Sequence, residues 1–305
     1  MMRSISVAFV VTFLGLTPAF AQTDEEVAVA RQQYLDGDYT NALALLVPAA
    51  QAGNPRAQNL VGAAYQYGNG GLAVDAQKAL EYYNLSAAQN FPSSHHNLGV
   101  LYDIGMEGIP RDLTRARAYY EQSVTIGWLG SFSNLAVMLR DGIGGPADEP
   151  RAIALLEQGL AQGDGPSIHA LAYMYYEGVA VPVDLKRARD LYEQAAAAGI
   201  PQAMNVYGAM LENAEGGFPD LPGAMAQYRN AMSYGEAYGG VNAAWLIFNH
   251  PEDYPDQVEG LALCYWARDH ASAEDADTYA NACDDVAVGY SKGEVESAIK
   301  RSVTF

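Results

Sequence analysis

A pattern of small and large residues recurs every 36 or 37 residues along this chain of 305 residues, and it constrains the fold more than any other feature. One column of the pattern holds a small residue, and a large residue follows three positions later. The small residues are Gly62, Gly99, Ala136, Ala172, Gly208 and Ala244. A period of this length indicates a solenoid, because one unit cannot bury its apolar face without stacking on its neighbours.

Each unit predicts two helices joined by a polar loop. Ala57, Val61 and Ala64 share one face of the first helix. We expect a glycine to end that helix, a role that only the last two units, with Ala214 and His250, lack. The glycines are Gly68, Gly105, Gly142 and Gly178. We expect an aspartate to cap the second helix of every unit. The aspartates are Asp75, Asp112, Asp148, Asp184, Asp220 and Asp256.

The columns together resemble the Sel-one-like repeat family of the tetratricopeptide superfamily. The resembling series runs through Ala57, Gly62, Tyr65 and Gly68, and then through Asp75, Ala79, Tyr82, Tyr83, Ala87 and Ala88. The resemblance implies an all-α, right-handed solenoid of stacked helix-turn-helix repeats that offers a scaffold surface to protein partners. The expected segments are a signal peptide at 1–21, a tetratricopeptide-like N-terminal repeat at 22–54, six Sel-one-like repeats at 55–271 and a C-terminal helical cap at 272–305.

The N-terminus has the composition of a secretory signal. Arg3 precedes an apolar stretch at 5–16, and Ala19 and Ala21 flank Phe20 as a small-x-small cleavage site. The apolar stretch is too short to span a membrane as a helix. We therefore expect cleavage after Ala21 and a periplasmic protein that is not embedded in a membrane, or a secreted one if the source is not Gram-negative.

The net charge of −19 restricts the partners. Nucleic-acid binders need clustered Lys and Arg to displace counterions, so the charge excludes a broad nucleic-acid surface. A basic peptide or a basic protein face would be attracted instead. Surface acidity that only keeps an exported protein soluble is the alternative, and the sequence leaves both open.

Residues that could carry chemistry are few. Cys264 and Cys283 predict a disulfide in an oxidising compartment, which would staple the C-terminal cap. The adjacent His95 and His96 diverge on a helix and do not form a chelating face. The glycine-rich stretches fall in the repeat loops, and the Glu252–Asp253 pair is interpreted as solvated surface. We therefore expect no catalytic residue, no metal site and no cofactor.

The candidate partner-binding surface is the face of each first helix opposite its core positions. Three positions per unit form this row, which also includes Asn59, Gln66, Asn205 and Glu212. Its candidate contact residues are His96, Asp103, Arg140, His169, Tyr173, Tyr176, Trp245 and Phe248. Aromatic residues dominate interface hot spots, and such a face is the usual groove of a solenoid. The alternative is that these side chains pack against a neighbouring helix.

The sequence thus favours a non-enzymatic periplasmic scaffold that binds a peptide or protein on its concave face. Two other functions stay open as alternatives. One is a regulator that binds the sensor domain of a membrane kinase, as some periplasmic relatives do. The other is a hydrolase acting on cell-wall or β-lactam substrates, although no Gly-x-Ser-x-Gly motif is present.

Overall fold

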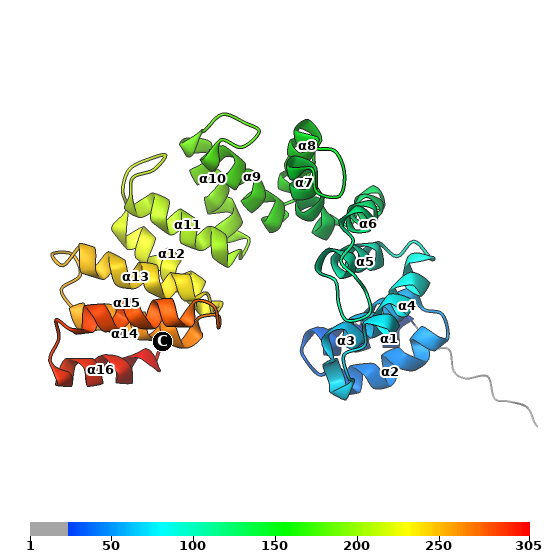
Figure 1. The fold of residues 1–305 in the computed structure, drawn as a ribbon, viewed down its shortest axis with the longest axis horizontal. Coiled ribbons are helices and arrows are strands. Elements are labelled where there is room, and N and C mark those ends of the chain that lie inside the picture. The colour runs from blue at the N-terminus through cyan, green and yellow to red at the C-terminus, as the bar shows by residue number, and fades with distance from the viewer. Residues whose placement is uncertain (1–23) are drawn as a thin grey trace, which may run out of the picture. The chain divides into compact units, whose positions relative to one another are not determined.

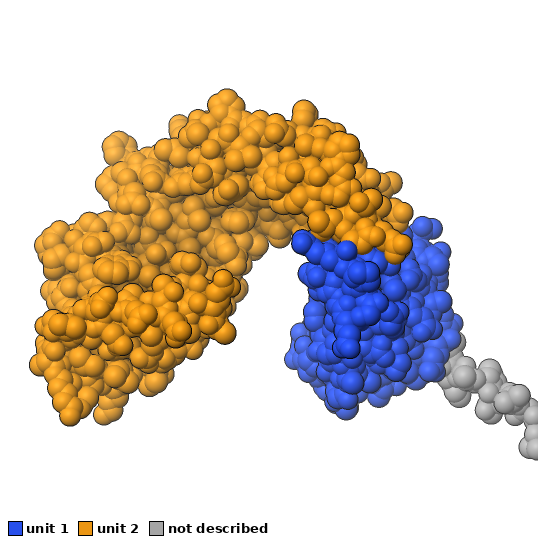
Figure 2. All heavy atoms as spheres, in the orientation of Figure 1, with its two compact units in different colours: residues 1–111 blue, residues 112–305 orange. Residues whose placement is uncertain are grey.

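The computed structural model describes residues 24–305, so the expected signal peptide and its cleavage site lie outside the described residues. The described residues divide into two compact units, 24–111 and 112–305, which Figure 2 distinguishes by colour. Both units are built of α-helices, and the expected all-α repeat solenoid is confirmed. Within residues 24–305 there is no helix that combines the length and the apolar character needed to cross a membrane.

The first unit stacks two and a half helical hairpins (Figure 1). Its elements are α1 (Asp24–Leu35), α2 (Tyr39–Gln51), α3 (Pro55–Tyr67), the 3₁₀ turn η1 (Asn69–Gly71), α4 (Ala76–Ala87) and α5 (Pro92–Ile104). Its core includes Val27, Leu46 and Val61, all buried. Neighbouring helices pack in chain order, as a structure of nearest-neighbour contacts requires.

The second unit continues the same alternation of first and second helices. Its elements are α6 (Leu113–Thr125), the 3₁₀ turn η2 (Leu129–Ser131), α7 (Phe132–Asp141), α8 (Glu149–Ala161), α9 (Gly165–Glu177), α10 (Leu185–Ala197), α11 (Pro201–Glu212), α12 (Leu221–Ser233), α13 (Ala237–Asn249), α14 (Gln257–His270), α15 (Ala276–Ala287) and α16 (Lys292–Ser302). In Figure 1, α11 lies between α9 and α13 in this stack.

The aspartate column caps the second helix of every repeat, as predicted. Each carboxylate accepts a hydrogen bond from the backbone N–H three residues later, at 2.9 to 3.2 Å. The predicted glycine stops are also present, because Gly68, Gly142 and Gly178 end their helices in the left-handed conformation. That conformation favours glycine, so these two columns fix where each helix begins and ends.

The small-residue column makes room for a buried tyrosine. A side chain at Gly62 would place its Cβ 2.8 Å from the ring of Tyr83, and one at Gly208 would lie 2.6 Å from the ring of Tyr228. Tyr83 and Tyr228 are both almost fully buried. The two helices of a repeat therefore approach closely because a small residue faces a large ring.

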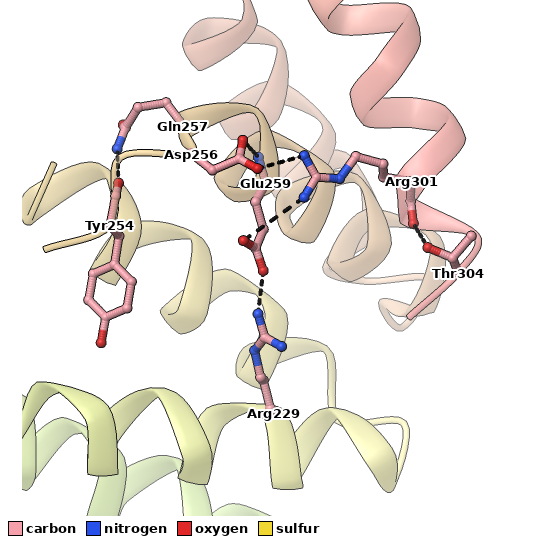
Figure 3. Close-up of polar contacts among 7 residues, drawn as sticks. All are labelled: Arg229, Tyr254, Asp256, Gln257, Glu259, Arg301 and Thr304. Carbon is pink, nitrogen blue, oxygen red and sulfur yellow. Dashed lines mark hydrogen bonds and ion pairs between the residues drawn. The ribbon is translucent and has the colours of Figure 1, made fainter.

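The C-terminal helices are held by covalent and ionic links. The expected disulfide between Cys264 and Cys283 joins α14 to α15. Arg301 of α16 donates to Asp256 at 3.0 Å, and Glu259 of α14 pairs with both Arg301 and Arg229 of α12 (Figure 3). The last repeat is therefore tied to the cap on one side and to the preceding repeat on the other.

Candidate functional site

The candidate contact residues lie on the first helices of the repeats, in both units. His96 and Asp103 are on α5 of the first unit. The others are on α7, α9 and α13 of the second unit, where they form two groups. The first group is Arg140, His169, Tyr173 and Tyr176, and the second is Trp245 and Phe248.

Arg140 and Tyr173 form the polar centre of the first group. The Arg140 guanidinium donates to both carboxylate oxygens of Asp141, at 2.6 and 2.7 Å, and lies 5.7 Å from the centre of the Tyr173 ring. The hydrogen bond from Arg140 lowers the pKa of the Asp141 carboxyl. Tyr173 keeps 41% of its surface exposed, so its ring is backed by a cation and still open to solvent.

His169 and Tyr176 flank this centre and rest on the second helix of their own repeat. Their rings contact the buried ring of Tyr192 edge to face, at 5.7 and 6.2 Å between centroids. Burial lowers the pKa of His169, which favours a neutral imidazole. Burial and a hydrogen bond with Glu215 raise the pKa of Tyr176. These two side chains are partly packed, which agrees with the alternative that they pack against a neighbouring helix.

The second group stands on α13. Trp245 is 44% exposed and meets the ring of Phe248 edge to face, with 5.8 Å between centroids. Phe248 is half-buried, and its ring touches the position where a side chain on Gly260 would project. Trp245 is therefore the more exposed member of the pair, and the Phe248 ring packs against it.

The expectation that the whole row faces away from the core is wrong at the last of its three positions. Gln66 is only 3% exposed, and its Oε1 accepts a 2.6 Å hydrogen bond from the Tyr83 hydroxyl. Glu212 accepts the same bond from Tyr228 at 2.8 Å. A buried hydroxyl needs a partner, and this position of the row supplies it.

Arg140 occupies the same position in a repeat that has Leu156 in place of the tyrosine. Without a hydroxyl to satisfy, the Arg140 side chain turns to Asp141 and Tyr173 instead. In this repeat the polar group therefore pairs with a neighbouring carboxylate and ring, and its side chain is only 17% exposed.

The first position of the row is also more buried than expected. Asn59 and Asn205 are 7% and 8% exposed. The Asn97 amide donates to Asn59 Oδ1 at 2.9 Å, which links α3 to α5. These asparagines lie where consecutive first helices meet. Among the aromatic residues of the row, those at the middle position, Tyr173 and Trp245, are the exposed ones.

The first-unit candidates are held within their own helix and loop. His96 is half-buried on α5, and burial lowers its pKa. Asp103 forms an ion pair with Arg111 at 3.6 Å, while Arg111 Nε donates to the Asp103 carbonyl at 2.6 Å. The pair fastens the loop that follows α5.

Sequence reasoning missed a pocket of about 550 Å³ between the loops that precede α12 and α14. Leu221, Met225 and Tyr254 give it apolar walls, and Asp220 and Asp253 are also among its lining residues. The signal that could have found it is the break in the repeat columns at His250, where the loop glycine is lost.

One group near this pocket has donor atoms close enough to share a metal ion, among the residues that the structure describes. His250, Glu252 and Asp253 place one ligand atom each within 4.8 Å of one another. Glu252 is 71% exposed, and exposed carboxylates gather in this way on many acidic surfaces. The cluster carries no argument for metal chemistry.

Comparison with known families identifies the repeats. The Sel1 repeat family matches residues 55–91, 92–127, 133–164 and 165–200. The two units that follow lie outside the matched residues, and they are the ones with Ala214 and His250 in the glycine column. No curated protein matches the chain.

Solved structures share the fold. A protective antigen of uropathogenic Escherichia coli with an SLR fold is 23% identical, with a TM-score of 0.61 over 92% of this chain, which spans 60% of the antigen's length. A Sel1 repeat protein from Oxalobacter formigenes is 22% identical, with a TM-score of 0.63 over 78% of this chain and 97% of its own. An immunity protein from Pseudomonas aeruginosa is 16% identical, with a TM-score of 0.53 over 69% of this chain and 82% of its own.

Proposed function

We propose, because the Sel1 repeat family matches four segments of this chain, that it is an exported, non-enzymatic scaffold that binds a peptide or protein partner. The observation that carries the proposal is the row of first helices in the second unit. Tyr173 and Trp245 keep 41% and 44% of their surface exposed at the middle position of this row, and Tyr238 at the start of α13 is 52% exposed. Exposed aromatics on a rigid helical face are typical of interface anchors.

The surroundings of both rings favour binding over solvation. Arg140 supports Tyr173 from one side, and Phe248 supports Trp245. A ring that is already fixed loses little conformational entropy when a partner covers it. The Arg140 guanidinium adds a hydrogen-bond donor beside the first ring. We therefore place the contact surface on α7, α9 and α13.

Export to an oxidising compartment is part of the same proposal. The disulfide between Cys264 and Cys283 supports it, because disulfides persist mainly outside the cytosol. The composition of residues 1–21 supports it as well. Fusing those residues to a reporter enzyme that is active only after export tests this part, and a reporter retained inside the cell would contradict it.

Site-specific photo-crosslinking tests the contact surface. A photoreactive phenylalanine analogue would replace Tyr173 or Trp245 in cells that naturally produce the protein. Tyr234, an aromatic residue at the end of α12 that is 60% exposed, is the matched control. We expect one and the same adduct from positions 173 and 245 and none from 234. Adducts formed equally well at all three positions would contradict the assignment, because exposure alone would then explain them.

A further inference from the structure

The pocket between the loops before α12 and α14 lies where the last repeat lacks a glycine that two earlier loops place close to a second helix. A side chain on Gly144 would place its Cβ 2.2 Å from the Leu113 carbonyl oxygen, and one on Gly216 would lie 2.2 Å from that of Leu185. Each loop therefore closes onto the start of the preceding second helix. In the last repeat the corresponding residue is Glu252, whose side chain is 71% exposed.

Two of the closed junctions are filled by an arginine of the chain itself. Arg117 Nη1 donates to the Pro146 carbonyl at 2.8 Å, and Arg189 Nη2 donates to the Phe218 carbonyl at 3.0 Å. The equivalent residue in the last junction, 36 positions after Arg189, is Met225, which lines the pocket. Leu80 and Ile153 hold this position in the other junctions.

The residue that packs against the arginine in those two junctions also differs in the last repeat. A Cβ on Gly145 would lie 3.1 Å from Arg117 Nη1, and one on Gly217 would lie 2.7 Å from Arg189 Nη1. The corresponding residue of the last repeat is Asp253. The last junction thus has an aspartate and a methionine at the positions where the junctions of Arg117 and Arg189 have a glycine and an arginine.

We propose that this pocket binds the guanidinium group of an arginine supplied by a protein partner. The carboxylates of Asp220 and Asp253 match its charge and its paired donors, and the Tyr254 ring offers a flat surface for stacking. Met225 and Leu221 suit the aliphatic part of the side chain. The inference rests on the proposed function in one respect, namely that the partner is a protein.

Among the described residues, His250 approaches one of these carboxylates, since a nitrogen of its ring lies within 4.8 Å of a carboxylate oxygen of Asp253, and it also lies 4.0 Å from Glu252. The charge of Arg229 acts to lower the pKa of Tyr254. Its guanidinium forms an ion pair with Glu259 (Figure 3). Asp220 accepts its capping bond from the Gly223 N–H through Oδ1, and its Oδ2 also lies close to Gly223. The Tyr254 carbonyl accepts from Gln257, and its ring points away from the ion-pair network in Figure 3.

The test uses N-acetyl-argininamide and its neutral isostere N-acetyl-citrullinamide as probes. The protein, labelled at its methionine methyl groups, is titrated at low salt with EDTA present, and Met225→Leu assigns the Met225 signal. We expect a saturable shift of that signal with the arginine derivative and binding about tenfold weaker with the citrulline derivative. An unmoved Met225 signal, or equal shifts with both probes, would overturn the proposal.

Three variants locate the charge. Asp253→Asn and Asp220→Asn each remove a carboxylate, and asparagine at 220 retains the helix cap. Each is expected to weaken binding of the arginine derivative about tenfold. Asp184→Asn, at the same cap position of another repeat, is the control and should leave it unchanged. Unaltered binding in Asp253→Asn would refute the proposal.

Met225→Arg introduces the arginine that two of the other junctions hold. The new side chain is expected to fill the pocket as Arg189 fills its own junction. This variant has no Met225 signal, so binding is followed by saturation-transfer NMR of the arginine probe, whose signal should be seen with the parent protein and lost with the variant. Continued binding of the probe to a folded Met225→Arg protein would contradict the account. None of these measurements uses Tyr173 or Trp245, so failure here and failure of the proposed contact surface are distinguishable.

Discussion

At the scale of single residues, the fold depends on pairs of a small residue and a buried tyrosine. Gly208 faces Tyr228 and Gly62 faces Tyr83, with no room for a Cβ. The phenol of each tyrosine is then satisfied by a polar residue of the first helix. Burial raises the pKa of both tyrosines, so they stay neutral donors over the working range of pH.

The first prediction concerns this pairing. Gly208→Ala is expected to destabilise the protein by about 1–3 kcal/mol, because the added methyl group overlaps the Tyr228 ring. At an ordinary helical position, replacing glycine with alanine stabilises the protein. Gly293→Ala, where nothing lies within 4 Å, is the control and should be neutral or stabilising. Urea unfolding measures both, and equal effects would show that the close approach is not tight.

The second prediction concerns His169. Burial lowers its pKa from 6.5, so the unfolded chain binds more protons than the folded protein below that value. Stability is therefore expected to fall as pH decreases through 6.5 towards the lowered pKa of the folded state. His169→Gln should flatten this part of the stability curve between pH 7 and 5. A variant whose unfolding midpoint falls with acid as steeply as that of the parent would contradict the assignment.

At the scale of helices and loops, the caps separate each repeat into two defined helices. The Asp184 carboxylate accepts from the Arg187 N–H at 2.9 Å, and the same bond recurs in every repeat from the second onward. The bond satisfies an N–H group that the helix itself leaves unpaired. Caps of this kind set where the second helix starts, and so where the next repeat can pack.

The third prediction tests one cap. Asp184→Ala is expected to cost about 1 kcal/mol of unfolding free energy, and Asp184→Asn only a small fraction of that, because asparagine caps nearly as well. Thermal or urea unfolding of the two variants measures the difference. Equal losses in both would indicate that charge, rather than the capping hydrogen bond, carries the effect.

The fourth prediction concerns α15, which the disulfide joins to α14. Only Tyr279 and Cys283 of α15 are buried, so the helix has little apolar contact of its own. Reduction of the disulfide is expected to lower the unfolding free energy by up to about 3 kcal/mol, because the bond restricts the unfolded chain over a loop of this size. Hydrogen exchange should quicken in α15 while α9 and α10 stay protected. Unchanged exchange in α15 would show that packing alone holds it.

The elements that the sequence predicts well are those set by local chemistry. Asp184 and Gly178 act within one turn of their own helix, so their spacing alone predicts the caps and stops. Gln66 could not be placed, because its burial depends on the Tyr83 hydroxyl of another helix. The pocket at Met225 depends on a contact between two repeats, and single-column spacing does not report it.

At the scale of the whole molecule, the charge of −19 gains a specific interpretation. The column aspartates are engaged as helix caps, and several other acids pair with arginines inside the stack. Asp253 lies at a pocket where Met225 stands at the position that Arg117 and Arg189 hold in two other junctions. We therefore expect a partner that is basic at one point and apolar at another, rather than attraction by bulk charge.

The central claim is that the row of first helices in the second unit binds a protein partner. Its most direct test is the dissociation constant of the crosslinked partner, measured by calorimetry for the parent, for Tyr173→Ala/Trp245→Ala and for the exposed control Tyr234→Ala. The account predicts a loss of about 30-fold or more in affinity for the double variant, because each ring is an interface anchor, and no change for the control. Affinity preserved in a folded double variant would contradict it.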